Sequence, residues 1–141
     1  MTDTFKLVTD TLLTPAGLET SDIDRLMGRL LSQDIDYADL YFQYSRQEGW
    51  VLEDGAVKSG SRSTDQGVGL RAVSGEKTGF AYSDEFVLPA LAQAADAARA
   101  IAKSGGATSP VQWRNAKSPS LYTPADPLSS LSDQDKVELL Q

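Results

Sequence analysis

The residue pattern with the most specific chemical meaning is Gly67-Val-Gly69-Leu-Arg-Ala72, which matches the G-x-G-x-x-A fingerprint of dinucleotide-binding proteins. That chemistry requires the glycines to leave a strand and open a helix, because the helix N-terminus holds the pyrophosphate. Here the glycines lie inside an alternating apolar run that continues into a turn. The context therefore favours a strand, where glycine more often marks a bulge or the close approach of another backbone.

Two further groups of residues could hold an ion. Asp34, Asp36 and Asp39 suggest calcium, but an EF-hand loop counted from Asp34 needs a glycine in place of Asp39 and a glutamate in place of Ser45. A phosphate could be held by the polar residues Lys58, Ser59, Ser61, Arg62, Ser63 and Thr64. Solvation of a helix end and a strand start explains the aspartates better, and a polar strand edge and loop explains the second group better.

The chain contains no cysteine and no histidine. This excludes disulfides, Cys/His zinc sites, cysteine nucleophiles and histidine acid–base catalysis among these residues. We predict no catalytic, cofactor-binding or metal-ligating residue in the chain. The net charge of -7, with no cluster of Lys and Arg, argues against direct nucleic-acid binding.

A sheet between Asp36 and Tyr82 must position the candidate residues. Apolar residues recur there at every second position, with turn residues at short intervals, which is typical of consecutive antiparallel strands. Asp54-Gly55 suits a type I′ hairpin turn that pairs Trp50 with Ser59. With further connections at residues 47–49 and 61–66, the pattern predicts a meander of about five strands.

The last hairpin of this sheet holds the candidate binding residues. Gly75-Glu76 suits a type II′ turn, which sets Arg71 against Phe80 and Gly69 against Tyr82. One face then carries Val68, Leu70, Ala72 and Ala81. The other carries the candidate substrate or partner surface, formed by Gly67, Gly69, Arg71, Phe80 and Tyr82. Both faces are partly apolar, so we expect cover on both sides and a cation–π contact between Arg71 and Phe80.

Helices are predicted on both sides of the sheet in sequence, which gives an α+β fold class. Two precede it, over Thr4–Leu13 and from a cap at Thr20 or Ser21 to about Asp34. A third, Ala-rich helix follows a cap at Ser83 or Asp84 and ends at Gly105-Gly106. Its stripe of small residues suits close packing on a sheet, and is formed by Leu88, Leu91, Ala95, Ala98 and Ala102.

Three segments are expected along the chain: an α+β domain over 1–104, a Pro/Ser-rich extended segment over 105–131, and the start of a truncated helix over 132–141. The middle segment is either a disordered linker or an extended strand pinned to a surface by its large apolar residues, which are Trp113, Leu121, Tyr122 and Leu128. Ser132 and Asp135 form a capping box for the last helix. Its abrupt end predicts a larger protein.

Four sequence blocks, DLYFQ, WVLEDG, DQGVG and SGEKTGFAY, are followed later by SPSLYTPADPL. In this order they resemble the N-terminal region of the catalytic-subunit branch of the TldD/PmbA zinc metalloprotease family, also called the modulator of DNA gyrase family. The resemblance implies a cytoplasmic bacterial peptidase that pairs with a PmbA-type subunit, also called TldE. It also implies unfolded peptide substrates, such as a microcin precursor or the antitoxin of a gyrase-poisoning system.

In that family, zinc is bound by a His-Glu-x-x-x-His helix and a Cys in the C-terminal part. No family catalytic residue therefore transfers to this chain, which has neither residue type. Our first hypothesis is an N-terminal substrate-binding and assembly domain, inactive without its C-terminal catalytic domain. The alternative is a free-standing β-sheet module that binds peptides or proteins and has no protease activity.

The N-terminal sequence MTDTFKLVTDTLL is too polar for a signal peptide, and no run approaches the ~20 apolar residues of a membrane span. We therefore expect a cytoplasmic protein without a membrane partner.

Overall fold

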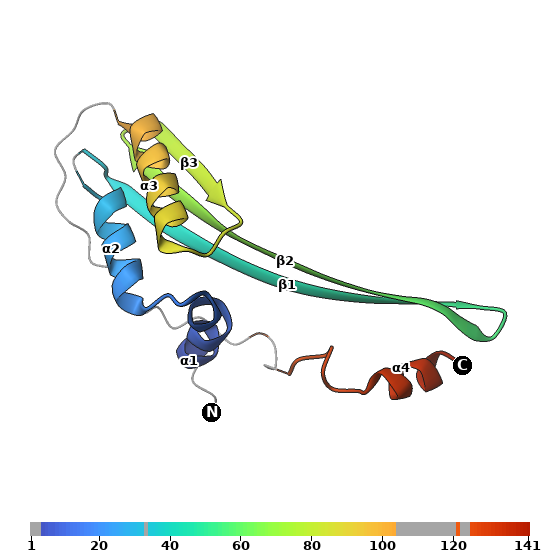
Figure 1. The fold of residues 1–141 in the computed structure, drawn as a ribbon. Coiled ribbons are helices and arrows are strands. Elements are labelled where there is room, and N and C mark those ends of the chain that lie inside the picture. The colour runs from blue at the N-terminus through green and yellow to red at the C-terminus, as the bar shows by residue number, and fades with distance from the viewer. Residues whose placement is uncertain (1–3, 33, 104–120, 122–124) are drawn as a thin grey trace. The chain divides into compact units, whose positions relative to one another are not determined.

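The computed structural model describes residues 4–32, 34–103, 121 and 125–141 and has an α+β fold (Figure 1). The chain forms two compact units. The helical unit combines Met1–Tyr44 with Asp65–Gln112, and the tip unit combines Ser45–Thr64 with Trp113–Gln141. The domain boundaries expected at 104 and 131 stay a prediction.

Among the described residues, the sheet has three antiparallel strands in the order β1-β2-β3, formed by Tyr37–Glu53, Ala56–Ser74 and Lys77–Ser83. The prediction of about five strands is wrong, because residues 47–49 and 61–66 continue strands instead of connecting them. A strand is defined by backbone pairing with its neighbour. Polar residues and glycines do not end it where both faces meet water, and residues 58–66 of β2 are all exposed.

Both predicted turns have the expected backbone conformation. Asp54 and Gly55 have φ angles of 51° and 75°, and positive φ at both central residues defines a type I′ turn. Gly75 has a φ of 57°, as the first central residue of a type II′ turn requires. The predicted register of the second hairpin is confirmed, with Arg71 opposite Phe80 and Gly69 opposite Tyr82.

The register predicted for the first hairpin, with Trp50 opposite Ser59, stays a prediction. Within the tip unit the Trp50 ring lies against Gly60, where an added Cβ would be 3.0 Å from the Trp50 Cζ3 atom. The missing side chain at Gly60 thus leaves room for the large ring.

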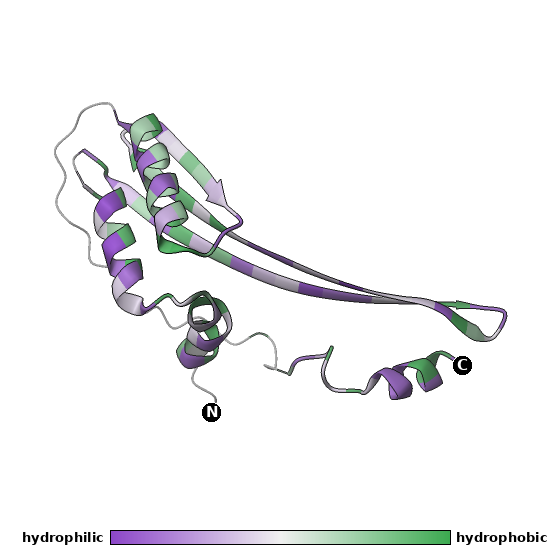
Figure 2. Ribbon diagram, in the orientation of Figure 1, coloured by the Kyte–Doolittle hydropathy of each residue, from purple (hydrophilic) through white to green (hydrophobic). Residues whose placement is uncertain are grey.

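Helices α2 (Thr20–Leu30) and α3 (Leu88–Ala102) cover one face of the sheet in the helical unit (Figure 1). Figure 2 shows α3 mostly in the pale green of a small-residue, apolar sequence, whereas α2 alternates between purple and green. The core contains the predicted sheet face of Val68, Leu70 and Ala72, all fully buried. The predicted stripe of α3 packs on it, with Leu91 and three alanines fully buried and Leu88 partly buried.

The N-terminal helical prediction is confirmed, although three short helical segments of different types take the place of one regular helix. They comprise α1 (Thr4–Val8), a π-helical segment (Thr9–Leu13) and a 3₁₀ turn (Thr14–Ala16). The predicted caps of the next two helices are wrong by a few residues. Glu19 caps α2, with its N–H donating to the Asp22 carboxylate at 3.0 Å, and Val87 precedes α3.

Two helix ends also differ from the prediction. Helix α2 ends at Leu30, before Asp34, whose positive φ of 64° cannot continue a helix. Helix α3 ends at Ala102, and the predicted terminator Gly105-Gly106 lies outside the described residues.

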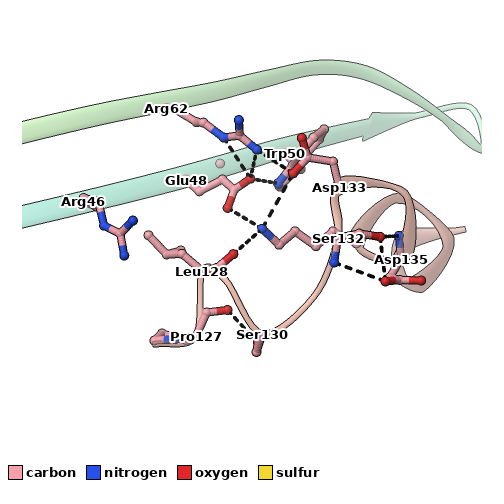
Figure 3. Close-up of polar contacts among 12 residues, drawn as sticks. Arg46, Glu48, Trp50, Arg62, Pro127, Leu128, Ser130, Ser132, Asp133 and Asp135 are labelled. Atoms are coloured by element: carbon pink, nitrogen blue, oxygen red, sulfur yellow. Dashed lines mark hydrogen bonds and ion pairs between the residues drawn. The ribbon is translucent and has the colours of Figure 1, made fainter. Parts of the chain in front are cut away.

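The tip unit contains α4 (Asp133–Leu140), and its predicted capping box is confirmed. The Asp135 N–H donates to Ser132 Oγ at 3.2 Å, and the Ser132 N–H donates to the Asp135 carboxylate at 3.1 Å (Figure 3). Of the expected extended segment, Trp113 and Tyr122 lie outside the described residues, and Leu121 is exposed.

A polar network ties α4 to β1 within the tip unit (Figure 3). Lys136 donates to the Glu48 carboxylate and to the carbonyl oxygen of Leu128, each at 2.7 Å. The Glu48 side chain is only 6% exposed, and it also accepts from Trp50 Nε1 at 3.1 Å and from Arg62. The Lys136 hydrogen bond is the main cause that lowers the pKa of Glu48.

Candidate functional site

The sheet face opposite the helices carries an open groove of about 550 Å³. All five predicted surface residues line it, namely Gly67, Gly69, Arg71, Phe80 and Tyr82. The other lining residues are Asp39, Tyr41 and Gln43 from β1, and Asp65 and Gln66 from β2. The structure thus brings the predicted residues together, while their role in binding stays a prediction.

The two glycines leave room for aromatic rings to lie flat across the sheet. A Cβ at Gly67 would lie 2.3 Å from Tyr82 Oη, and one at Gly69 would lie 3.0 Å from Phe80 Cε2. Tyr82 Oη donates to the carbonyl oxygen of Gln66 at 3.2 Å, which fixes its ring. The glycines therefore make way for side chains rather than for another backbone.

The close backbone approach expected of a strand glycine occurs at Gly79 instead. A Cβ there would lie 1.8 Å from the carbonyl oxygen of Ala98 in α3. This contact is on the helical side of the sheet, opposite the groove. It explains how α3 lies so close to β3.

The groove exposes three aromatic side chains. Tyr41, Phe80 and Tyr82 are 66%, 58% and 59% exposed. Cover was expected on both faces of the hairpin, and the helices supply it on one face only among the described residues. Contiguous apolar surface of this kind marks interaction sites in soluble proteins.

Arg71 is held at one end of the groove. Its Nε donates to Asp39 Oδ1 at 3.1 Å, and its guanidinium lies 5.6 Å from the ring centroid of Tyr37. The expected stacking of Arg71 on Phe80 is therefore wrong, although the two residues are opposite in register. The hydrogen bond to Asp39 is the main cause that raises the pKa of Arg71.

The ion-binding alternatives gain no support from the geometry. Asp36 accepts a hydrogen bond from the Gly75 N–H at 2.6 Å and Asp39 pairs with Arg71, so these aspartates have structural partners. Within ranges 4–32, 34–103 and 125–141, no three acidic side chains are placed to share a metal ion. Lys58 pairs with Glu53, and Arg62 pairs with Glu48 and Asp133. Acidic side chains thus neutralise both cations among the residues that could hold a phosphate.

The groove residues of β1 were not identified from the sequence. Asp39, Tyr41 and Gln43 alternate with Leu40 and Phe42, which was a usable signal that they share a face. Their position beside Gly67 and Gly69 depends on the pairing of β1 with β2. The sequence predicted a strand that ends before the connection at residues 47–49, so the long pairing of β1 with β2 was not expected. The site offers aromatic faces and a few charged groups, which suit binding, and no nucleophile paired with a base.

No helix among the described residues has the length and apolar character that crossing a membrane requires.

Comparison with known proteins gives a consistent result. Residues 38–102 match the family model described as PmbA/TldA metallopeptidase domain 1. The chain is 48% identical over 135 residues to the Metalloprotease TldD homolog of Haemophilus influenzae. This alignment covers 94% of the chain and 28% of the relative. It is also 36% identical to the Metalloprotease TldD homologs of two Buchnera aphidicola subspecies, those of Acyrthosiphon pisum and Schizaphis graminum. Each of these alignments covers 97% of the chain and 28% of the relative.

The chain thus spans 28% of the length of the curated relatives it matches, and it aligns with them over nearly all of its own residues. On this evidence, the chain belongs to the TldD/PmbA family of metalloproteases and contains the first domain of that family.

Proposed function

We propose that the full-length protein is a cytoplasmic zinc metallopeptidase that cleaves unfolded peptides together with a PmbA/TldE-type subunit. In this proposal the present chain is the N-terminal domain, which binds the substrate peptide and takes part in assembly with the catalytic domain and the partner. The metalloprotease names of the relatives support the reaction class. The chain itself has no histidine or cysteine, and within the described residues no three acidic side chains gather where they could hold zinc.

The observation that carries the proposal is the aromatic groove over Gly67 and Gly69. Aromatic rings laid flat on a sheet present a large apolar surface with little side-chain freedom left to lose. An extended peptide crossing such a surface can bury side chains of many kinds against it. Recognition of this sort tolerates different sequences, which suits a peptidase that acts on unfolded chains.

The test is a binding measurement on the 141-residue chain with a fluorescein-labelled, unstructured peptide, followed by fluorescence anisotropy. The double variant Phe80→Ser/Tyr82→Ser should weaken binding by about tenfold or more, because truncating an aromatic hot-spot residue costs more than ~1 kcal/mol. Ile101→Ser is the matched control, since Ile101 is an equally exposed apolar residue on α3. Unchanged binding in the double variant would remove the groove from the proposal.

The same chain tests the assignment of catalysis to the rest of the protein. We expect it to bind no stoichiometric zinc and to leave the labelled peptide intact. Zinc bound at one equivalent, together with peptide hydrolysis by the purified chain, would contradict this assignment.

A further inference from the structure

Of the charged side chains along the groove, those at one end form an ion pair, whereas the one at the other end does not. Asp65, Gly67, Gly69 and Arg71 occupy alternate positions of β2, so all four belong to the same face. The two charged ends are separated by about 20 Å at the usual rise of a strand. Arg71 is paired with Asp39, whereas the side chain of Asp65 forms no ion pair or hydrogen bond within the part of the chain that the structure describes.

The Arg71 end shows how this face holds a cation. The guanidinium pairs with the Asp39 carboxylate and lies over the ring of Tyr37, 5.6 Å from its centroid. The same two kinds of group recur at the other end. Asp65 supplies a carboxylate, and the exposed ring of Tyr82 lies over Gly67, the next position on that face. At the first end the chain itself supplies the cation, Arg71, whereas no cation of the described residues pairs with Asp65 at the other end.

We propose that the groove selects peptides carrying an arginine or lysine side chain, whose cation binds Asp65 beside the ring of Tyr82. This inference rests on the proposed function, in which the groove binds peptides. The faces of the exposed aromatic rings are electron-rich and attract cations. Of the charged lining residues, Asp39 and Arg71 neutralise each other, which leaves the negative charge of Asp65.

The charge of the whole chain acts in the same direction. Its net charge of -7 attracts cationic peptides and repels acidic ones. A basic peptide therefore matches the groove in local charge, in ring chemistry and in long-range attraction. An acidic peptide would place like charge beside Asp65.

The test compares two probe peptides that differ only in charge: N-acetylated, C-amidated Ala-Ala-Arg-Ala-Ala and its citrulline analogue, in which a neutral urea replaces the guanidinium. Dissociation constants come from NMR titration of the 141-residue chain. We expect the arginine peptide to bind about three- to fivefold more tightly at low salt, the range of an exposed ion pair with a cation–π contact. The difference should shrink as the salt concentration rises.

Two variants locate the effect. Asp65→Asn should lose most of the preference for the arginine peptide, with only the contribution of the Tyr82 ring and of the remaining net charge left. Glu76→Gln removes the same charge in the exposed Gly75-Glu76 turn, outside the groove lining, and should keep the preference. Spectra of the free variants establish that each is folded.

The outcomes separate this inference from the function on which it rests. Equal binding of both peptides by the unmodified chain would overturn the cation preference and leave peptide binding intact. No binding of either peptide would overturn both. Loss of the preference in Glu76→Gln to the same degree as in Asp65→Asn would assign it to net charge and overturn the role of Asp65.

Discussion

Gly79 shows at the scale of one residue how the fold positions the groove. Its missing Cβ allows the carbonyl oxygen of Ala98 to approach the sheet, and so allows α3 to cover β3. On the other side of the same strand, Phe80 and Tyr82 are exposed. One short strand thus separates a tightly packed face from an open one.

Gly79→Ala should destabilise the chain strongly. The added methyl group would lie 1.8 Å from a backbone oxygen, so α3 or β3 must move. We expect the free energy of unfolding to fall by about 3 kcal/mol or more, the upper end of the cost of overpacking. Urea denaturation measures this value.

The matched control for that measurement is Gly28→Ala. A Cβ at Gly28, inside α2, would meet no atom within 4 Å. Alanine is favoured over glycine in a helix interior by about 0.5–1 kcal/mol, so this variant should be slightly more stable. Equal effects of the two substitutions would contradict the packing described for Gly79.

Titration of two carboxylates should control the attachment of α4 in the tip unit. The pKa of Glu48 is lowered, mainly by the hydrogen bond from Lys136. The pKa of Asp126 is lowered to about 2, by hydrogen bonds from Ser129 and the Leu128 N–H and by Arg46. Both groups have an unfolded-state pKa near 4, so their stabilisation is complete above about pH 4–5 and is lost as the pH falls through the folded values.

We therefore expect the α4 amide signals in NMR spectra to lose their dispersion as the pH falls from 5 to 2. Glu48→Gln should show weakened α4 signals already at pH 7, because Lys136 and Arg62 then lose a charged partner. If α4 signals are independent of pH and of this substitution, the network does not hold the helix.

At the scale of elements, helices α2 and α3 are joined by the ion pair of Arg29 with Asp96, whose carboxylate also pairs with Arg99 within α3. Arg29 Nε donates to Asp96 Oδ1 at 2.7 Å, and Arg99 pairs with the same carboxylate at 3.3 Å. The Arg29 hydrogen bond is the main cause that lowers the pKa of Asp96. These side chains are partly exposed, so solvent screening limits their contribution.

Asp96→Asn should lower the free energy of unfolding by no more than about 1 kcal/mol at low salt. The loss should diminish in high salt, because screening already weakens the pairs in the unmodified chain. Thermal unfolding at two salt concentrations measures both effects. Asp84→Asn, at an exposed site after β3, is the control and should be nearly neutral.

The strand elements mark the limit of what the sequence predicts. Turn chemistry at Asp54-Gly55 and Gly75-Glu76 correctly marked where β1 ends, where β2 begins and ends, and where β3 begins, because positive φ angles restrict the residue type. The polar residues 61–66 resembled a loop in the sequence. In the structure they are exposed, and backbone pairing keeps them in β2.

At the scale of the whole molecule, the sequence identified one half of the groove. The five predicted residues come from the confirmed hairpin of β2 and β3. The β1 residues could not be added without the register of that strand. The correct partner of Arg71 was missed for the same reason, since Asp39 and Tyr37 both lie on β1.

The two compact units give the chain a division of roles. The helical unit contains the buried core and the groove, and the tip unit contains α4, none of whose residues is buried. In the proposed protein, the helical unit binds the peptide. In the same proposal, catalysis belongs to the C-terminal catalytic domain.

The most direct test of this account is steady-state cleavage of an unfolded peptide by the full-length protein with its PmbA/TldE-type partner. Removal of a groove that only binds substrate weakens ground-state and transition-state binding alike. Phe80→Ser/Tyr82→Ser should therefore raise KM by about tenfold and leave kcat unchanged. An unchanged KM, or a fall in kcat at constant KM, would contradict the assignment of the groove to substrate binding.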